Sequence, residues 1–256
     1  MIKKVLEEYE DSIELIFIES SLSIDFEHKK QRFDTETQDK INANWEESKK
    51  CFNGELIHVN KFLKDDTRIC FLTQIGSYKD FIGTKDERPD SLMLACGKAD
   101  CCMPLSIGAI VITKDGKIIV AKRNGTNLNN DFWSFPAEGY FNPKHAINGQ
   151  VSIFNGIADE LKEELGININ ELIYFRVLGI VFDRVITKQP YIAIIWKTNL
   201  SSFEIKSRFN KTKREEFKII DFIENKKIPF LDFIKEHELT LHNLGKAILY
   251  GLYMEW

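Results

Sequence analysis

The sequence predicts an α/β fold in which a mixed β-sheet is sandwiched between α-helices. Short apolar runs typical of strands alternate along the chain with segments that have helical periodicity, and this interleaving favours a mixed sheet between helical layers. The chain has 256 residues, which is enough to bury a large core. Its 43% hydrophobic and 29% charged residues are those of an ordinary globular protein.

Residues 1–104 are predicted to form an α+β extension ahead of a main domain at residues 105–256. Strands are expected at residues 12–18, 55–62 and 68–75, the last two joined by a turn at residues 64–66. Thr35-Glu36-Thr37-Gln38 has the pattern of a capping box, which predicts a helix that runs to about Lys50. Pro89 and the Gly97-Lys98 pair mark the passage into the main domain.

The main domain is expected to begin with a β-hairpin. Residues 106–113 and 117–123 read as strands, and Asp115-Gly116 between them is a strong two-residue hairpin signal. A loop with the sequence Trp-Ser-Phe-Pro-Ala-Glu-Gly follows at residues 133–139.

A helix ending at Leu165 is predicted next. Its apolar residues recur at helical spacing, and Gly166 suits the left-handed position that closes a helix. Further strands are expected at residues 172–182, 191–198 and 217–220, with a charged loop at 211–216 before the last. From Leu231 the spacing is again helical, through Leu244, Ala247, Ile248 and Leu252.

Three carboxylates of the first helix lie on one arc. At about 100° per residue, Glu160, Glu163 and Glu164 fall within about 100° of one another. Like charges at this spacing repel, unless a cation lies between them, and Mg²⁺ takes oxygen ligands of this kind. The alternative interpretation is a solvated acidic face.

The hairpin ending in Lys-Arg, the Trp-x-x-Pro loop and the acidic helix together resemble the Nudix hydrolase family. The family box runs Gly-x5-Glu-x7-Arg-Glu-hydrophobic-x-Glu-Glu-x-Gly-hydrophobic. Its second half matches at Glu160, Leu161, Glu163, Glu164, Gly166 and Ile167. The sequence departs from the box at its arginine, which is Asp159 here, and at the usual Pro-Gly-Gly, which is Pro136-Ala137-Glu138. The early box glutamate has no clear counterpart.

A second resemblance covers the N-terminal part of the chain. Asn44-Trp45-Glu46, Phe52-Asn53 and Tyr78-Lys79-Asp80-Phe81-Ile82-Gly83-Thr84 are similar to segments of the Nudix UDP-sugar diphosphatases, typified by an animal UDP-glucose enzyme. The two resemblances together span roughly residues 40–225.

The resemblance implies a Nudix fold and a pyrophosphohydrolase that uses Mg²⁺ or Mn²⁺. The expected reaction cleaves a nucleoside diphosphate sugar such as UDP-glucose to UMP and a sugar 1-phosphate. One alternative is a Nudix hydrolase for ADP-ribose, a dinucleoside polyphosphate or a capped nucleotide. Another is a Nudix-like module that binds a nucleotide without cleaving it, because the box arginine and the early glutamate are missing.

Roles for individual residues follow from the same resemblance. Glu160 and Glu164 are expected to be the principal metal ligands, with Glu163 as a further ligand or as the base that activates water. The Ala137 carbonyl would complete the metal sphere. Arg123 would bind phosphate oxygens, with a surface ion pair as the alternative interpretation. Glu215 or Glu216 is an alternative base, with a solvated loop charge as the competing interpretation of both.

Residues outside the box have predicted roles too. Phe52 and Tyr78 are expected to bind the substrate, one of them by stacking on uracil, with core packing as the alternative. Compared with the family, about seven extra residues separate the 133–139 loop from the helix, and His145 lies in this enlarged loop. It is expected to be exposed to solvent, with a pocket residue as the alternative. Cys101 and Cys102, with Cys96 before them, have no second ligand pair nearby, so reduced structural thiols are expected rather than a zinc site.

The charge and hydropathy of the chain exclude several classes of protein. A net charge of −4 gives no basic footprint for nonspecific binding to DNA or RNA. No apolar run approaches the roughly 20 residues that span a bilayer, and the acidic residues near Met1 do not suit a signal peptide. A cytoplasmic protein is therefore expected, while a small nucleotide as its substrate is what the resemblance implies. The sequence does not predict an oligomeric state.

Overall fold

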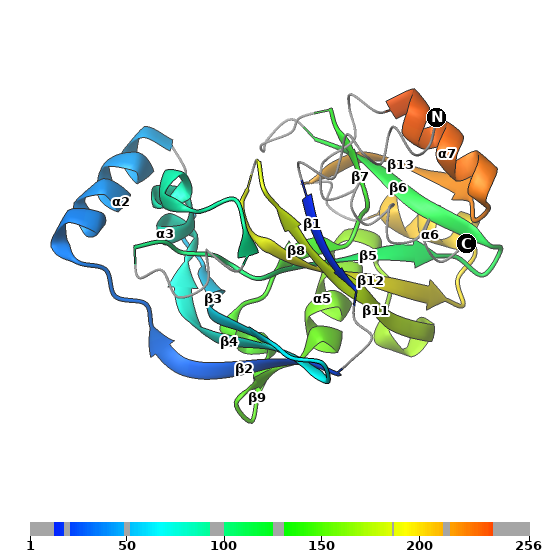
Figure 1. Cartoon of the computed structure of the whole chain (residues 1–256). Coiled ribbons are helices and arrows are strands. Elements are labelled where there is room, and N and C mark those ends of the chain that lie inside the picture. The colour runs from blue at the N-terminus through cyan, green and yellow to red at the C-terminus, as the bar shows by residue number, and fades with distance from the viewer. Residues whose placement is uncertain are drawn as a thin grey trace. The chain divides into compact units, whose positions relative to one another are not determined.

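The computed structural model describes residues 13–17, 21–48, 52–92, 100–124, 131–185, 187–211 and 216–237 (Figure 1). Contacts between Cα atoms divide the chain into two compact units. The first comprises residues 1–106, 140–153 and 182–191, and the second comprises residues 107–139, 154–181 and 192–256. Each unit is therefore built from segments that are far apart in the sequence.

The first unit contains a mixed five-stranded sheet with the strand order β3-β4-β2-β10-β9. Its strands are β2 (Ser21–Lys30), β3 (Glu55–Lys64), β4 (Arg68–Ser77), β9 (Ala146–Ile147) and β10 (Gln150–Val151). β3 and β4 pair antiparallel, as predicted, whereas β2 pairs parallel to β4. The strand β1 (Ile13–Phe17) is also present, as predicted.

Helices of the first unit are α2 (Thr35–Ser48) and α3 (Tyr78–Gly83), and they pack on each other. Short 3₁₀ turns, η1 (Lys85–Glu87) and η2 (Pro143–His145), follow in the chain. The predicted helix at α2 is present, but Thr35 does not cap it. Asp34 caps it instead, because its Oδ1 accepts the Thr37 N–H at 2.8 Å.

The second unit is built on the larger sheet, in which β11, β12, β5, β6 and β13 are neighbours in that order. The bounds are β5 (Ser106–Ile112), β6 (Lys117–Arg123), β11 (Leu172–Asp183), β12 (Pro190–Thr198) and β13 (Phe217–Glu224). Two short strands, β7 (Trp133–Ser134) and β8 (Glu138–Tyr140), pair with β6 and β5. The predicted hairpin is confirmed, but its loop has three residues, 114–116, and not the two expected at Asp115-Gly116. The Gly116 N–H donates to the Thr113 carbonyl, and Gly116 has the positive φ of 72° that closes such a loop.

Helices of the second unit pack against this sheet. They are α5 (Ile153–Leu165), α6 (Ser202–Phe209) and α7 (Lys227–His237), with the 3₁₀ turn η3 (Ile169–Glu171) after α5. Phe154 of α5 stacks on Trp196 of β12 with ring centroids 5.7 Å apart. Both α6 and α7 contact β13. The stripe predicted for α5 faces the core, since Ile157, Leu161 and Leu165 have no exposed area.

The α/β class with mixed sheets and packed helices is confirmed. None of the helices in the described ranges is long and apolar enough to cross a membrane. Some predictions lie outside the described residues. They concern Lys50, Cys96, Gly97, Lys98, most of the loop at 211–216 including Glu215, and Leu244, Ala247, Ile248 and Leu252.

Candidate active site

The turn between β7 and β8 is held by backbone bonds to the rest of the second unit. β7 lies beside β6, with Ser134 opposite Ala121. The Ala137 carbonyl accepts the Ala109 N–H of β5 at 3.1 Å. Ala137 itself is fully buried and has a φ of 74°, in the left-handed region that favours glycine. In this conformation the Ala137 N–H is directed toward α5.

Two glutamates of α5 meet this turn. The Glu164 carboxylate accepts the Ala137 N–H. Glu160 lies directly over Gly139, where a Cβ atom would collide with the Glu160 carboxylate. Position 139 therefore excludes a side chain for as long as Glu160 keeps this conformation. Glu163, the third predicted carboxylate, is exposed on the same helix.

Glu164 has a strongly perturbed pKa. The residue as a whole is partly exposed, but its carboxyl group is buried, and this burial raises the pKa of Glu164 well above the ordinary value. The charges of Glu216 and Glu160 raise it further. The hydrogen bond from Ala137 acts in the opposite direction but does not outweigh them. The structure thus brings Glu160, Glu164 and Glu216 into one electrostatic cluster. The first two are the predicted metal ligands, and Glu216 is the residue named as an alternative base, with a solvated loop charge as the competing interpretation.

Glu138 is a member of this site that the sequence analysis missed. Glu138 is buried. Its Oε1 accepts a hydrogen bond from the Ser134 hydroxyl at 2.5 Å, and its Oε2 accepts one from Arg123 Nη2 at 2.8 Å. Glu138 also contributes to the raised pKa of Glu164. A signal was present in the sequence, because a glutamate stands in the Pro-Ala-Glu-Gly turn, but the spacing does not reveal that the turn folds back onto β6.

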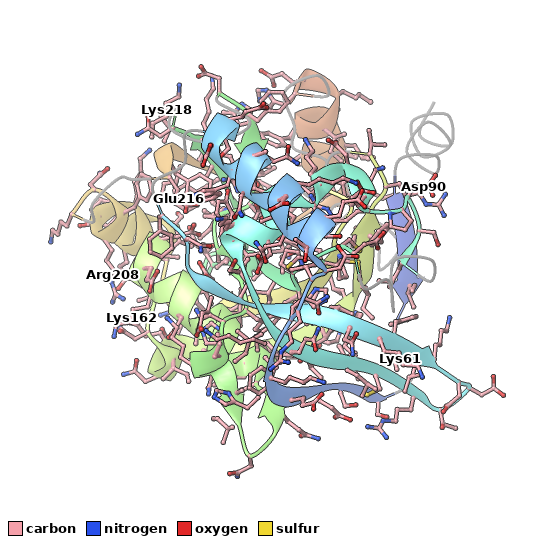
Figure 2. All side chains as sticks on the ribbon, turned by 90° about the vertical axis from the view of Figure 1, so that its left-hand side faces the viewer. Lys61, Asp90, Lys162, Arg208, Glu216 and Lys218 are labelled. Atoms are coloured by element: carbon pink, nitrogen blue, oxygen red, sulfur yellow. The ribbon has the colours of Figure 1, made fainter. Side chains whose placement is uncertain are left out.

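Arg123 lies between two carboxylates and is largely, but not fully, shielded from solvent. Its Nη2 contacts Glu138 and its Nη1 lies 3.8 Å from Glu216 Oε2, while the guanidinium lies 5.3 Å from the centre of the Phe217 ring. Burial alone would lower the pKa of Arg123, but the charges of Glu138 and Glu216 outweigh it and raise that pKa. Arg123 therefore takes part in the carboxylate cluster. Glu216 precedes β13, and Figure 2 labels it together with Lys218.

The donor chemistry of this cluster fits a hard divalent cation. Four carboxylates, those of Glu138, Glu160, Glu164 and Glu216, interact across the turn, so negative charge exceeds the single charge that Arg123 brings. Oxygen ligands of this kind suit Mg²⁺ or Mn²⁺. Within the described ranges, no three His, Cys, Asp or Glu side chains already form a ligand set for a metal ion. The cluster therefore suits a divalent cation by the charge and the oxygen chemistry of its side chains.

The predicted substrate-binding aromatic residues lie in the first unit. Phe52 is 78% exposed. Tyr78 is half-buried at the start of α3, where Ser77 and Asp80 form a capping box. Its ring contacts Trp45, Phe81 and Tyr140 at centroid distances of 6.3, 5.9 and 6.3 Å. Tyr78 is thus part of an aromatic cluster, whereas the Phe52 ring is largely open to solvent.

His145 differs from its prediction. It is buried, with 2% of its surface exposed, and its Nδ1 accepts the Asn142 N–H at 3.3 Å. The enlarged loop is folded into η2, β9 and β10, so the imidazole caps a turn and packs on Phe141 instead of meeting solvent. Cys70, Cys101 and Cys102 are buried, reduced cysteines, as expected for Cys101 and Cys102.

No protein-family model matches the sequence, and no curated protein matches it. Solved structures of similar fold include a protein from Deinococcus radiodurans, 11% identical, covering 76% of this chain and 96% of that chain with a TM-score of 0.47. A Nudix hydrolase from Nitrosomonas europaea is 13% identical over 60% of this chain and 90% of that chain, with a TM-score of 0.42. The Nudix domain of NrtR from Shewanella oneidensis, solved with ADP-ribose, is 11% identical over 60% of this chain and 88% of that chain, with a TM-score of 0.41.

Proposed function

We propose that this protein is a Mg²⁺-dependent Nudix pyrophosphohydrolase that cleaves a nucleoside diphosphate sugar of the UDP-glucose type to UMP and a sugar 1-phosphate. The observation that carries the proposal is the meeting of Glu160 and Glu164 with the turn at residues 136–139. Through these contacts, the part of α5 that matches the Nudix box lies against the loop at residues 136–139, to which the resemblance assigns a metal ligand.

The proposed reaction breaks one phosphoanhydride bond. Water adds to one phosphorus, the bridging P–O bond breaks, the departing phosphate keeps the bridging oxygen, and a base takes the proton of the water. A bound divalent cation would neutralise negative charge on the diphosphate and lower the pKa of a bound water. Glu160 and Glu164, with the Ala137 carbonyl, would hold it, and Mn²⁺ has the same donor preference.

Two carboxylates are candidates for the base. Glu163 is the one predicted from the box, and it is exposed on α5. Glu216 is supported by its electrostatic interaction with Glu164, which places its charge inside the cluster. A base has to reach the water directly or through one intermediary, so single substitutions of these two residues by glutamine separate them.

Recognition of the nucleotide is proposed for the first unit. Tyr78 offers a half-buried ring and Phe52 an exposed one, and stacking of a base on such a ring is worth about 1–3 kcal/mol. The division into a substrate-binding extension, residues 1–104, and a hydrolase domain, residues 105–256, belongs to this proposal. So does a cytoplasmic location.

Hydrolysis of a nucleotide panel with and without Mg²⁺ tests the proposal. We expect UDP-glucose to be cleaved only with the ion, and the double variant Glu160→Gln/Glu164→Gln to lose at least about 100-fold in kcat. Glu236→Gln, an exposed glutamate of α7, is the matched control and should keep full activity. Cleavage of ADP-ribose but not UDP-glucose would refute the substrate class, and full activity of the double variant would refute the ligand assignment.

A further inference from the structure

We propose that Arg123 is a positioning residue, which holds Glu138 and Glu216 at the carboxylate cluster and does not bind the substrate phosphates itself. The inference rests on the proposed function, because it assigns a role within the same site. It differs from the role that the resemblance implies for Arg123, and the geometry of the side chain is the reason.

Both ends of the Arg123–Glu138 pair are shielded from solvent. The side chains of Arg123 and Glu138 are only 14% and 5% exposed, and Nη2 and Oε2 lie 2.8 Å apart. The other oxygen of Glu138 accepts the Ser134 hydroxyl, so both carboxylate oxygens are engaged. A buried ion pair of this kind is costly to break from one side, because the remaining charge is left without a partner.

Arg123 also lies where three chain segments meet. Its N–H donates to the Phe132 carbonyl at 2.9 Å, and the N–H of the next residue, Asn124, donates to the Glu216 carbonyl at 2.7 Å. In the β6–β13 ladder Arg123 lies opposite Phe217, and its guanidinium lies near that ring. The backbone around Glu216 is therefore attached to Arg123 through both the strand and the side chain.

Little of the guanidinium is left for a phosphate. Recognition of phosphate by arginine uses two N–H groups as a fork. Here one N–H of Nη2 donates to Glu138, and Nη1 lies 3.8 Å from Glu216 Oε2, which is an ion-pair distance and not a hydrogen bond. Nε is buried without a hydrogen-bond partner, so the fork formed by Nε and Nη2 is not open to a phosphate. The positive charge instead offsets the repulsion among carboxylates that the proposed function needs close together.

Kinetics of four variants test this role: Arg123→Gln, Arg123→Lys, Glu138→Gln and the double variant Arg123→Gln/Glu138→Gln. We expect Arg123→Gln to lower kcat about 100-fold, the cost of a small misplacement of catalytic groups, with KM for the nucleotide sugar nearly unchanged. Glu138→Gln should also lower kcat, and the double variant should be no worse than the poorer single variant. Arg123→Lys should recover part of kcat, since it keeps the charge.

Lys122→Gln is the matched control, because Lys122 is the neighbouring residue of β6 and its ion pair is with Asp131 at 3.6 Å. It should leave kcat and KM unchanged. The opposite result for Arg123→Gln, a rise in KM of about tenfold or more at preserved kcat, would identify a phosphate-binding group and overturn the proposal. Losses of the two single variants that multiply in the double variant would overturn it as well, because they would mean that the residues act independently.

Amide hydrogen exchange provides a readout that does not depend on activity. We expect Arg123→Gln to speed exchange in the segment around Glu216 and Phe217, while Lys122→Gln leaves it as in the wild type. Unchanged exchange in Arg123→Gln overturns the proposal. If the wild-type protein hydrolyses no nucleotide, the proposed function fails, yet exchange still reports whether Arg123 holds this segment. Glu138→Gln, which keeps the size of the side chain, gives the same test if Arg123→Gln does not fold.

Discussion

At the scale of single residues, Ala137 combines an unfavourable backbone conformation with a specific contact. Its φ of 74° costs a non-glycine residue about 1–2 kcal/mol, and its N–H donates to Glu164. Strain that persists in this way is expected where the surrounding structure enforces it. The β7–β8 turn is enforced from both sides, by β5 and by α5.

Substitution of Ala137 measures this strain. Ala137→Gly should change the free energy of unfolding by between 0 and about 1 kcal/mol in the stabilising direction, because relief of strain is partly offset by the greater freedom of glycine in the unfolded chain. Ala137→Val should destabilise the protein by more than about 2 kcal/mol, since a β-branched residue suits this φ poorly in a site with no free space. Urea unfolding checks both, and a stabilising valine would contradict the assigned conformation.

His58 carries a pH dependence of stability in the first unit. It is buried, the Met103 N–H donates to its Nδ1 at 2.7 Å, and burial lowers its pKa from 6.5 to about 4. The unfolded state therefore takes up a proton, at pH values between these two, that the folded state does not. Stability from this group is fully present above about pH 6.5 and is lost as the pH falls toward about 4.

The loss should amount to about 3 kcal/mol, at 1.36 kcal/mol for each pH unit between the two pKa values. Urea unfolding of the wild type from neutral to acidic pH measures the slope. His58→Asn keeps an acceptor for the Met103 N–H but does not titrate, so its stability should fall less steeply over the same range. An equal slope in both proteins would show that other groups cause the loss.

At the scale of elements, α5 is placed by its apolar stripe and ended by Gly166. Gly166 has a φ of 66°, and the N–H groups of Gly166 and Ile167 donate to the carbonyls of Lys162 and Leu161. This left-handed residue satisfies carbonyls of the last turn that would otherwise lack partners. The end of the helix also sets where Glu164 stands relative to the β7–β8 turn.

Replacement of the capping glycine should therefore cost stability. Gly166→Ala is expected to lower the free energy of unfolding by about 1 kcal/mol, because alanine is unfavourable in the left-handed region. Lys162→Ala, at an exposed position of the same helix labelled in Figure 2, should change it by less than about 0.5 kcal/mol. Thermal unfolding compares the two, and equal effects would mean that the glycine conformation contributes nothing.

At the start of α2, the residue that caps the helix in the structure is Asp34, whereas the sequence pattern suggested Thr35. Asp34 accepts the Thr37 N–H, and this bond lowers the pKa of the Asp34 carboxyl group. Asp34→Ala should lower Tm by about 2–4 °C, whereas Thr35→Ala, at an exposed first helical position, should lower it by less than about 1 °C. Calorimetry checks this, and the reverse order would restore Thr35 as the cap.

At the scale of the whole molecule, the carboxylate cluster links stability to the bound ion. An ion that binds only the folded state raises its stability by RT ln(1 + [L]/Kd), about 2.7 kcal/mol at a hundredfold excess over Kd. Millimolar Mg²⁺ should therefore raise the Tm of the wild type, and a chelator should reverse the rise. Glu160→Gln/Glu164→Gln should lack this response, and without the ion it should melt higher than the wild type, because the repulsion with Glu216 is removed.

The course of the chain explains which elements could be predicted. Local periodicity, turn residues and caps specify three parts of the fold, namely the 106–123 hairpin, the β3–β4 pair and α5. The structure confirms all three predictions. β2 was not predicted, although apolar residues alternate with polar ones from Leu22 to Phe26, because its partner β4 lies more than forty residues away. The segments 140–153 and 182–191 belong with the first unit only through contacts that no local pattern encodes.

The sequence by itself determined the α/β class and the helix that carries Glu160, Glu163 and Glu164, because periodicity and like-charge spacing are properties of neighbouring residues. Only the tertiary structure decided that Glu138 and Glu216 join Glu160 and Glu164, that Glu163 stays exposed, and that Arg123 lies between two carboxylates. The physical reason is that hydrogen bonds and charge interactions depend on distance in space, and the β7–β8 turn and β13 reach α5 only when the sheet has formed.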